Sequence, residues 1–427
     1  MQPAHNRRMD ASIRPPTTGL LLTGGGARAA YQVGVLEALA DLRRASGARH
    51  ERNPFDIITG TSAGAINAAA LACGADDFDT SVARLASVWS QFEAGQVYEA
   101  DLLGVLRTGA RWMSLLSLGW VIARWRRIKP RSLLDNSPLE ELLKRLVPLE
   151  RLPELIAQGH LQALAVTASS YSSGHHVTFY EGIEQLQPWV RSQRLAVRDH
   201  ITHTHLLASS AIPFVFPAQA LAINGGEEYF GDGSMRQTAP VAPAIHLGAE
   251  RILVVGAGRM AEPRDTLLKA APATYPSLAQ IAGHAMSSIF LDALAVDVER
   301  IRRINQTLNL IPREARQASA LRPVELLVIT PSQRVDQLAA EHAKSLPHAV
   351  RALLGGLGVS SNHVDIKGGA LASYLLFESA FTRELMALGY ADTMEQEDEV
   401  CHFFGWGSGA AAPEAPVPTE RRSAARV

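Results

Sequence analysis

The chain has 427 residues, of which 47% are hydrophobic and 19% charged, and its formal net charge is −1. This composition is typical of a soluble globular protein with one large domain or two, and it excludes the global basic field that favours nucleic acid. Two cysteines, Cys73 and Cys401, are too few for a disulfide framework and suit a reducing compartment.

The first residues lack the apolar segment of a secretory signal. Residues 1–17 contain three arginines but no hydrophobic run, so we expect a flexible leader. No stretch of the chain reaches the roughly 18 apolar residues that a membrane span requires. We therefore expect a cytoplasmic protein, with peripheral contact to the membrane left open.

The N-terminal part follows a strand–helix–strand order. Residues 19–23 form an apolar run typical of a strand in a parallel sheet. A run of small residues around one arginine follows at 24–29, and the apolar spacing over residues 31–42 predicts a helix. Residues 55–61 predict a second buried strand. The small residues that follow Ser62 predict a helix through position 71. This order is that of a βαβ unit opening an α/β domain.

Residues 102–131 combine basic, aromatic and apolar side chains. They contain no acidic residue, but seven arginines or lysines and three of the six tryptophans. Their apolar run over residues 112–123 is too short to span a bilayer. Such a pattern is typical of an interfacial helix on anionic lipid, and a core helix with a solvated basic turn would show it as well. A lid, a membrane-docking helix and plain core all remain open.

The rest of the chain predicts more strands and then helices. We expect strands over residues 161–169, 176–180, 229–232, 251–256 and 324–330, and helices over residues 203–210, 238–247, 278–306, 332–358 and 367–388, the last ending at Gly389. We expect a catalytic domain over residues 18–260. A mixed, mainly helical region over 261–407 would complete it or pack on it, and a disordered tail over 408–427 would follow.

One serine stands at the turn between the second predicted strand and its helix. Gly60 and Gly64 flank Ser62 two residues away on either side, the G-x-S-x-G spacing of a nucleophile elbow. A sharp strand-to-helix turn brings the two elements so close that glycines are needed, and the helix N-terminus adds free N–H groups. We interpret Ser62 as a nucleophile; a glycine-rich turn that happens to carry a serine would show the same five residues.

The run from Gly24 to Arg28 can stabilise a developing negative oxygen. Its glycines allow several N–H groups to point the same way, and a helix follows. Arg28 could fix this loop, face an anionic part of the substrate or lie on the surface. The run also matches the G-x-G-x-x-[GA] pattern of a dinucleotide site. However, Asp41, the acidic residue at a suitable distance, lies inside the predicted helix and not at a strand end.

The base that would activate Ser62 is less evident from spacing. An α/β-hydrolase would use a downstream acid and then a histidine, but none of the later histidines has a distinctive setting: His246, His284, His342, His348, His363 and His402. Asp232 lies between two glycines at a strand end, where a carboxylate with a raised pKa can take the serine proton directly. Asp-Gly is also a common turn. His175-His176 and His203-x-His205 lack the partners of a metal site, so we expect no metal and no cofactor.

Three motifs in order resemble the patatin-like phospholipase family over about residues 17–260. They are Gly24-Gly25-Gly26-Ala27-Arg28-Ala29, Gly60-Thr61-Ser62-Ala63-Gly64 and Asp232-Gly233-Ser234, joined by Ala208-Ser209-Ser210-Ala211-Ile212-Pro213. The resemblance implies a three-layer α/β/α fold with a mostly parallel central sheet, and the C-terminal helical extension is consistent with a bacterial subgroup. It also implies hydrolysis of lipid acyl esters by a Ser–Asp dyad, in the manner of a phospholipase A or lysophospholipase, without a metal.

Carried over by position, the family's site falls on named residues of this chain. Ser62 would be the nucleophile and Asp232 the base, and the N–H groups of Gly25, Gly26 and Ala27 would form the oxyanion hole, supported by Arg28. Two positions depart from the family's usual pattern, Ala29 in place of Gly and Ser234 in place of Gly or Ala. Both residues are small, so we expect activity to persist and substrate choice to change. The alternatives are a histidine-dependent α/β-hydrolase esterase and a non-catalytic membrane-associated regulator.

Overall fold

The computed structural model describes residues 15–48, 52–99, 132–223, 225–260, 278–317, 319, 321–356 and 366–407. Several sequence predictions lie outside these ranges: the leader up to residue 14, the basic and aromatic segment 102–131, and the tail 408–427.

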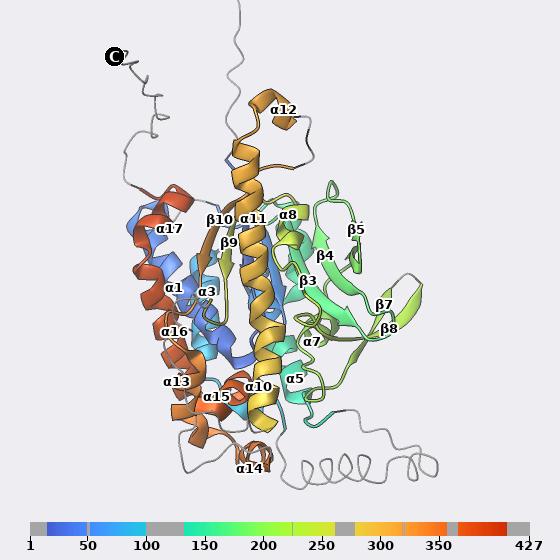
Figure 1. Ribbon diagram of the computed structural model, residues 1–427, viewed down its shortest axis with the longest axis vertical. Coiled ribbons are helices and arrows are strands. Elements are labelled where there is room, and N and C mark those ends of the chain that lie inside the picture. Colours follow the sequence, from blue (N-terminus) through green and yellow to red (C-terminus); the bar gives the residue numbers. More distant parts are fainter. Residues whose placement is uncertain are drawn as a thin grey trace, which may run out of the picture.

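A mostly parallel sheet runs through the centre of the molecule (Figure 1). Its parallel strands lie in the order β10 (Glu325–Ile329), β9 (Arg251–Val255), β1 (Thr18–Leu22), β2 (Ile57–Thr61) and β3 (Ala163–Ser170). Beyond β3 the sheet continues through β4 (His176–Gly182), β6 (Arg194–Arg198) and β5 (Val190–Arg191). The antiparallel pair β7 (Gln219–Ile223) and β8 (Gly226–Asp232) joins the end of β3.

Alternate side chains of the central strands face two hydrophobic cores. Leu20, Leu22 and Ile58 belong to one core, whereas Leu21 and Ile57 belong to the other, as the two-residue period of a strand requires. Helices cover both faces, which gives the predicted three-layer α/β/α arrangement. On the first side lie α1 (Ala30–Ala45), α2 (Ala63–Ala72), α3 (Phe78–Ser90), α5 (Ser137–Leu146) and α7 (His203–Ser209); on the second lie α8 (Ala242–His246) and α11 (Ala293–Asn309).

The predicted elements of the first 330 residues are confirmed to within a few residues. Three short strands, β5, β6 and β7, were not predicted. The long helical pattern over residues 278–306 consists of α10 (Leu278–Ser287), a π-helical turn at Ser288–Asp292 and α11. In Figure 1, α11 crosses one face of the sheet, while α1, α16 and α17 stand together on the other side.

Each of the two long helices predicted in the C-terminal region is divided in the structure into two shorter helices. The helix expected over residues 332–358 is interrupted between α13 (Val335–His342) and α14 (His348–Gly356) by a 3-10 turn at Ala343–Ser345 and by Leu346, which leaves the helical region before Pro347. The helix expected over 367–388 is two helices, α15 (Ile366–Leu375) and α16 (Ser379–Met394). A further helix, α17 (Glu397–Phe404), was not predicted.

Gly389 is not the helix stop that the sequence predicted. It lies inside α16 and faces α1, where a Cβ at this position would be 2.1 Å from the carbonyl oxygen of Tyr31. On the opposing helix, a Cβ at Gly34 would be 1.8 Å from the carbonyl oxygen of Met386. Two glycines therefore let α1 and α16 pack backbone against backbone.

The C-terminal region shares the sheet and the first-side core with the residues before it. β10 pairs with β9, and Phe381 and Leu385 of α16 belong to the same core as Leu36 of α1. The expected domain boundary at residue 260 stays a prediction. Within the described ranges, no helix combines the length and the apolar character needed to cross a bilayer.

Candidate active site

Ser62 lies at a strained turn between β2 and α2. Its φ of 56° and ψ of −133° are values that residues other than glycine rarely adopt. A Cβ at Gly60 would lie 2.5 Å from the carbonyl oxygen of Gly64, and one at Gly64 would lie 2.4 Å from those of Leu22 and Thr23. The two glycines therefore allow strand and helix to approach, as the elbow motif predicts.

The side chain of Ser62 bonds to that of Asp232. Ser62 Oγ donates a hydrogen bond of 2.6 Å to Asp232 Oδ2, and the N–H of Ser234 donates one of 2.8 Å to Oδ1. Asp232 ends β8, where it lies opposite Ala168 of β3, and β3 is the neighbour of β2. The sheet register thus joins two residues that are 170 positions apart.

Burial makes Asp232 a stronger base than an exposed aspartate. Its side chain is 0% exposed, and Ser62 is 1% exposed. Burial raises the pKa of Asp232 from 3.8 to about 6, against the opposing effect of the hydrogen bonds from Ser62 and Ser234. A carboxylate with a pKa near neutrality can accept a proton from a hydroxyl in its hydrogen bond.

Ser209 holds the two halves of the site together, a role that sequence reasoning missed. Its Oγ accepts the N–H of Ser62 at 2.9 Å and donates to the carbonyl oxygen of Thr167 at 2.6 Å. Its own carbonyl oxygen accepts the N–H of Gly233 at 3.0 Å. The signal was present, because Ser209 belongs to the fourth motif of the family resemblance, but spacing alone assigned it no function.

The histidines near the site are structural. The Nε2 atom of His176 lies 3.0 Å from the carbonyl oxygen of Gly233, and burial lowers the pKa of this imidazole to about 4. A neutral ring that donates to this carbonyl supports the turn after Asp232. His205 accepts the N–H of Thr202 and caps α7.

Neither a histidine base nor a metal site emerges from the described residues. Of the six histidines after Asp232, His363 lies outside them, and none of the other five hydrogen-bonds to Ser62 or Asp232. In the same part of the chain, no three histidine, cysteine or acidic side chains are grouped as metal ligands would be.

The glycine loop lies beside the elbow. Gly26–Ala29 form a 3-10 turn that begins with Gly26 at a φ of 56°. Within the described ranges, the N–H groups of Gly25, Gly26 and Ala27 donate no hydrogen bond. Gly26 and Ser62 line the same cavity. Free donors beside a serine are what an oxyanion hole requires.

Arg28 contacts the C-terminal region and does not line this cavity. Its Nε donates to Ser373 Oγ at 2.7 Å, its Nη2 donates to the carbonyl oxygen of Ala370 at 3.4 Å, and its guanidinium lies 4.3 Å from the ring centroid of Tyr374. Of the roles considered from the sequence, these contacts fit an arginine that fixes the loop.

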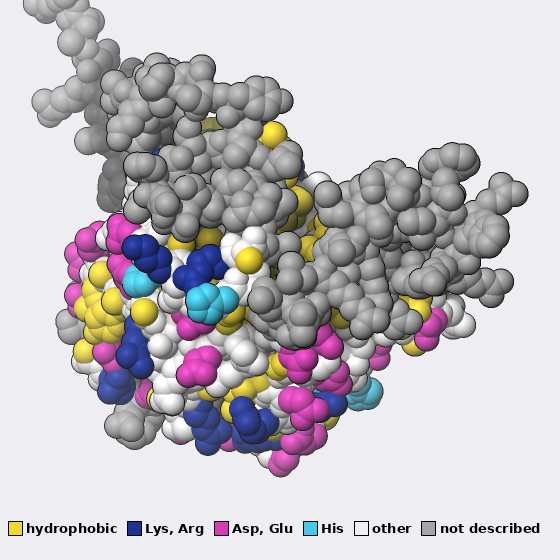
Figure 2. All heavy atoms as spheres, turned by 90° about the horizontal axis from the view of Figure 1, so that it is seen from below, with side chains coloured by type: hydrophobic (Ala, Val, Ile, Leu, Met, Phe, Trp, Pro, Cys, Tyr) yellow, Lys and Arg dark blue, Asp and Glu magenta, His cyan; other side chains and the backbone are white. Residues whose placement is uncertain are grey.

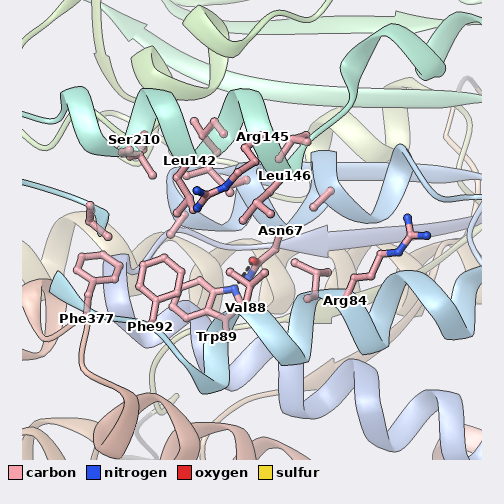
Figure 3. A pocket seen from close by; sticks show the side chains of 18 of the residues that line it. Asn67, Arg84, Val88, Trp89, Phe92, Leu142, Arg145, Leu146, Ser210 and Phe377 are labelled. Carbon is pink, nitrogen blue, oxygen red and sulfur yellow. Dashed lines mark hydrogen bonds between the residues drawn. The ribbon is translucent and has the colours of Figure 1, made fainter. Parts of the chain in front are cut away.

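An apolar cavity of about 460 Å³ starts at Ser62 and follows α2. One face of this helix lines it through Ala63, Ile66, Asn67 and Ala70, and the residues just after the helix, Cys73 and Gly74, continue the lining. Figure 3 shows Leu142 and Leu146 of α5 on one wall and Trp89, Phe92 and Phe377 on the other. The amide of Asn67 is fully used by Ala29, Gln32 and Trp89.

A three-layer α/β/α fold with a serine elbow beside an apolar cavity defines a class of serine hydrolases that act on lipids. The chain belongs to the patatin-like phospholipase family, whose model matches residues 20–245. Membership implies lipid hydrolase activity.

The solved structures that resemble this chain include VipD and ExoU. VipD from Legionella pneumophila is 13% identical, with a TM-score of 0.34, and the match covers 90% of this chain and 67% of that one. The type III effector ExoU is 15% identical, with a TM-score of 0.26 and coverage of 93% and 90%. ExoU in complex with SpcU, from Pseudomonas aeruginosa, is 15% identical, with a TM-score of 0.24 and coverage of 85% and 77%. No curated protein matches the chain.

Proposed function

We propose that the protein hydrolyses acyl esters of lipids through a dyad of Ser62 and Asp232. The observation that carries this proposal is the hydrogen bond of 2.6 Å from Ser62 Oγ to the buried carboxylate of Asp232. Its substrate class is that of a phospholipase A or lysophospholipase, because the apolar cavity beside Ser62 suits a fatty acyl chain.

The chemistry has two halves that use the same two side chains. Ser62 Oγ attacks the ester carbonyl carbon while Asp232 takes its proton, and the N–H groups of Gly25, Gly26 and Ala27 bind the oxyanion. The C–O bond breaks, and the alcohol leaves with the proton from Asp232. Water then attacks the acyl carbonyl carbon while Asp232 takes its proton. The bond from that carbon to Ser62 Oγ breaks, Asp232 returns the proton to Ser62 Oγ, and the fatty acid leaves. Each step uses groups of the chain, without a metal or cofactor.

The cavity suits a long acyl chain. From Ala63 to Cys73 the lining face of α2 is about 15 Å long, at the rise of an α-helix. Asn67 presents no unpaired polar group to the cavity, because its side-chain amide forms its hydrogen bonds with Ala29, Gln32 and Trp89. A chain that extends from Ser62 along α2 would bury its methylene groups against Leu, Val and aromatic side chains.

A fluorophosphonate probe tests the dyad, because it reacts only with an activated serine. We expect labelling of the wild-type protein, none of Ser62→Ala, and a rate at least about 1,000-fold lower for Asp232→Asn. Ser90→Ala is the matched control, since its hydroxyl bonds only to the carbonyl oxygen of Ser87 one turn earlier. Labelling of Ser62→Ala, or wild-type rates in Asp232→Asn, would contradict the assignment.

We also propose that residues 102–131 contact anionic membrane lipid, so that the protein works at the cytoplasmic membrane face. The composition of this segment supports it, as do the described residues at its two ends. The N–H of Glu99 donates to the carbonyl oxygen of Asp135, and that of Leu134 to the carbonyl oxygen of Val215. The next residue in the chain, Phe216, lines the cavity. The segment therefore leaves and re-enters the described structure beside the proposed acyl site.

A further inference from the structure

We propose that residues 370–377, at the junction of α15 and α16, belong to the active site, where they position the glycine loop and contact the substrate. In this proposal Ser373 and Tyr374 are positioning residues for the glycine loop, and Phe377 is a substrate-contacting residue. The inference rests on the proposed function and extends it beyond residues 20–245, the range of the family match.

The contacts of Arg28 carry the first half of the proposal. Arg28 is 4% exposed, yet it forms no ion pair with a carboxylate in the described part of the chain. Its partners are the hydroxyl of Ser373, the carbonyl oxygen of Ala370 and the ring of Tyr374. A buried guanidinium whose acceptors come from one helix turn is fixed relative to that turn, because losing an acceptor leaves a buried donor unpaired.

The backbone of α15 also supports the loop directly. A Cβ on Gly26 would lie 2.3 Å from the carbonyl oxygen of Tyr374. Ser373 Oγ donates to Ala370 at 2.6 Å, which leaves its lone pairs for Arg28. Oxyanion donors accelerate a reaction only when they are aligned beforehand. A loop of consecutive glycines is flexible by itself, so its alignment has to come from these neighbours.

Phe377 carries the second half. It follows α15 by two residues and lines the cavity that holds Ser62. Its ring lies 5.7 Å from that of Phe92 and 6.4 Å from that of Tyr98, and the Tyr98 hydroxyl donates to the carbonyl oxygen of Leu375. Figure 3 shows Phe377 beside Phe92 and Trp89 on one cavity wall. One short segment thus contacts both the glycine loop and the acyl site.

Ser373→Ala tests the positioning role. With p-nitrophenyl butyrate, we expect kcat to fall about tenfold, a part of the loss seen when an oxyanion donor is removed, with KM unchanged. The rate of fluorophosphonate labelling should fall in the same proportion. Ser379→Ala is the matched control, because Ser379 lies on α16 and its side chain does not contact Arg28. Thermal unfolding of both variants establishes that they are folded.

A double-mutant cycle distinguishes loss of the hydrogen bond between Arg28 and Ser373 from a general disturbance of the active site. Arg28→Met removes the same hydrogen bonds from the loop side and serves as the test if Ser373→Ala does not fold. If both residues act through one contact, Arg28→Met/Ser373→Ala is no slower than Arg28→Met. Labelling of folded Ser373→Ala at the wild-type rate, or effects that multiply in the double variant, would overturn the positioning role. If the wild-type protein itself is not labelled, the proposed function fails instead.

Phe377→Leu tests the cavity wall with a different readout. We expect KM for p-nitrophenyl palmitate to rise several-fold through loss of ring contact with the acyl chain, and to rise more than KM for p-nitrophenyl butyrate, while Ser379→Ala keeps the wild-type KM for both esters. An unchanged KM for the long ester in the folded variant would show that Phe377 does not contact substrate.

Discussion

At Asp232, burial that favours catalysis should make activity depend on pH in the acid range. The carboxyl must be ionised to accept the proton of Ser62, and its pKa is about 6. We therefore expect kcat/KM to rise with pH through about 6 and to level off above it. A pH–rate profile with a soluble ester measures this. A midpoint near 4, the value of an exposed aspartate, would mean that the carboxylate is hydrated in the working enzyme.

The same burial should cost stability. The carboxyl titrates at 3.8 when unfolded and at about 6 when folded, so below about pH 3.8 it is protonated in both states and carries no penalty. As pH rises from about 3.8 to about 6, the unfolded state releases this proton while the folded state still holds it, and the free energy of unfolding falls by up to about 3 kcal/mol. Asp232→Asn lacks this titration.

Denaturant unfolding measures that cost. We expect the stability of Asp232→Asn relative to wild type to increase between about pH 4 and about pH 7, by up to about 3 kcal/mol. A constant difference over this range would show that Asp232 titrates normally in the folded protein. A variant more stable than wild type at neutral pH would indicate that the Asp232 carboxylate serves catalysis at a cost in stability, and a less stable variant would indicate that it stabilises the fold.

At the scale of one element, α2 carries both the nucleophile at its N-terminus and one side of the acyl cavity. Ala70 lines that cavity about 12 Å along the helix from Ser62. A phenylalanine there should block the cavity beyond roughly ten carbons of an extended chain. We expect Ala70→Phe to lower kcat/KM for p-nitrophenyl palmitate at least about tenfold and to leave p-nitrophenyl butyrate nearly unchanged.

Ala83→Phe is the control for that variant, because Ala83 is exposed on α3 and does not line the cavity. Equal losses on short and long esters in Ala70→Phe would indicate damage to the elbow and not a shortened cavity. Unchanged hydrolysis of the long ester would place the acyl chain elsewhere.

The pairing of α1 with α16 depends on two glycines. Gly34 has no room for a Cβ against Met386, so Gly34→Ala must separate the helices or shift the backbone. We expect a loss of about 3 kcal/mol in the free energy of unfolding, measured in denaturant. Gly95→Ala is the matched control, since a Cβ at Gly95 would meet no atom within 4 Å. If Gly34→Ala were as stable as the control, the contact between α1 and α16 would be looser than the structure shows.

Across the whole molecule, charge is mixed. Figure 2 shows acidic and basic side chains interspersed over the described part of one face, in keeping with a net charge of −1. Because the protein as a whole is nearly neutral, attraction to an anionic surface would have to come from a local basic segment. Residues 102–131 are such a segment, since they hold seven positive charges and no negative one.

Liposome co-sedimentation tests that attraction. We expect binding to vesicles containing phosphatidylserine at low salt, loss of binding at high salt, and little binding to neutral phosphatidylcholine. Replacing the seven basic residues of 102–131 by glutamine should abolish binding and leave fluorophosphonate labelling unchanged. Binding that is insensitive to both salt and these substitutions would remove the electrostatic docking proposal.

The sequence by itself determined the local parts of the molecule. The elbow at Ser62, the glycine loop at Gly25 and Gly26 and the alternation of the buried strands all follow from constraints between residues a few positions apart. For that reason the α/β fold class, the family and the succession of strands and helices in the first elements could be predicted. Asp232 was nominated by its place between glycines at a strand end, although the sequence could not show where that strand lies in the sheet.

Tertiary structure alone decided which of these parts meet. The register of β8 on β3 brings Asp232 to Ser62, and Ser209, the last residue of α7, bonds to the backbone of Ser62 and of Gly233. Arg28 finds its acceptors on α15, 345 positions away. Gly389, which resembles a helix stop, is instead a point of contact between two helices. Such contacts depend on how elements pack after the chain has folded, and no pattern within a short stretch of sequence encodes them.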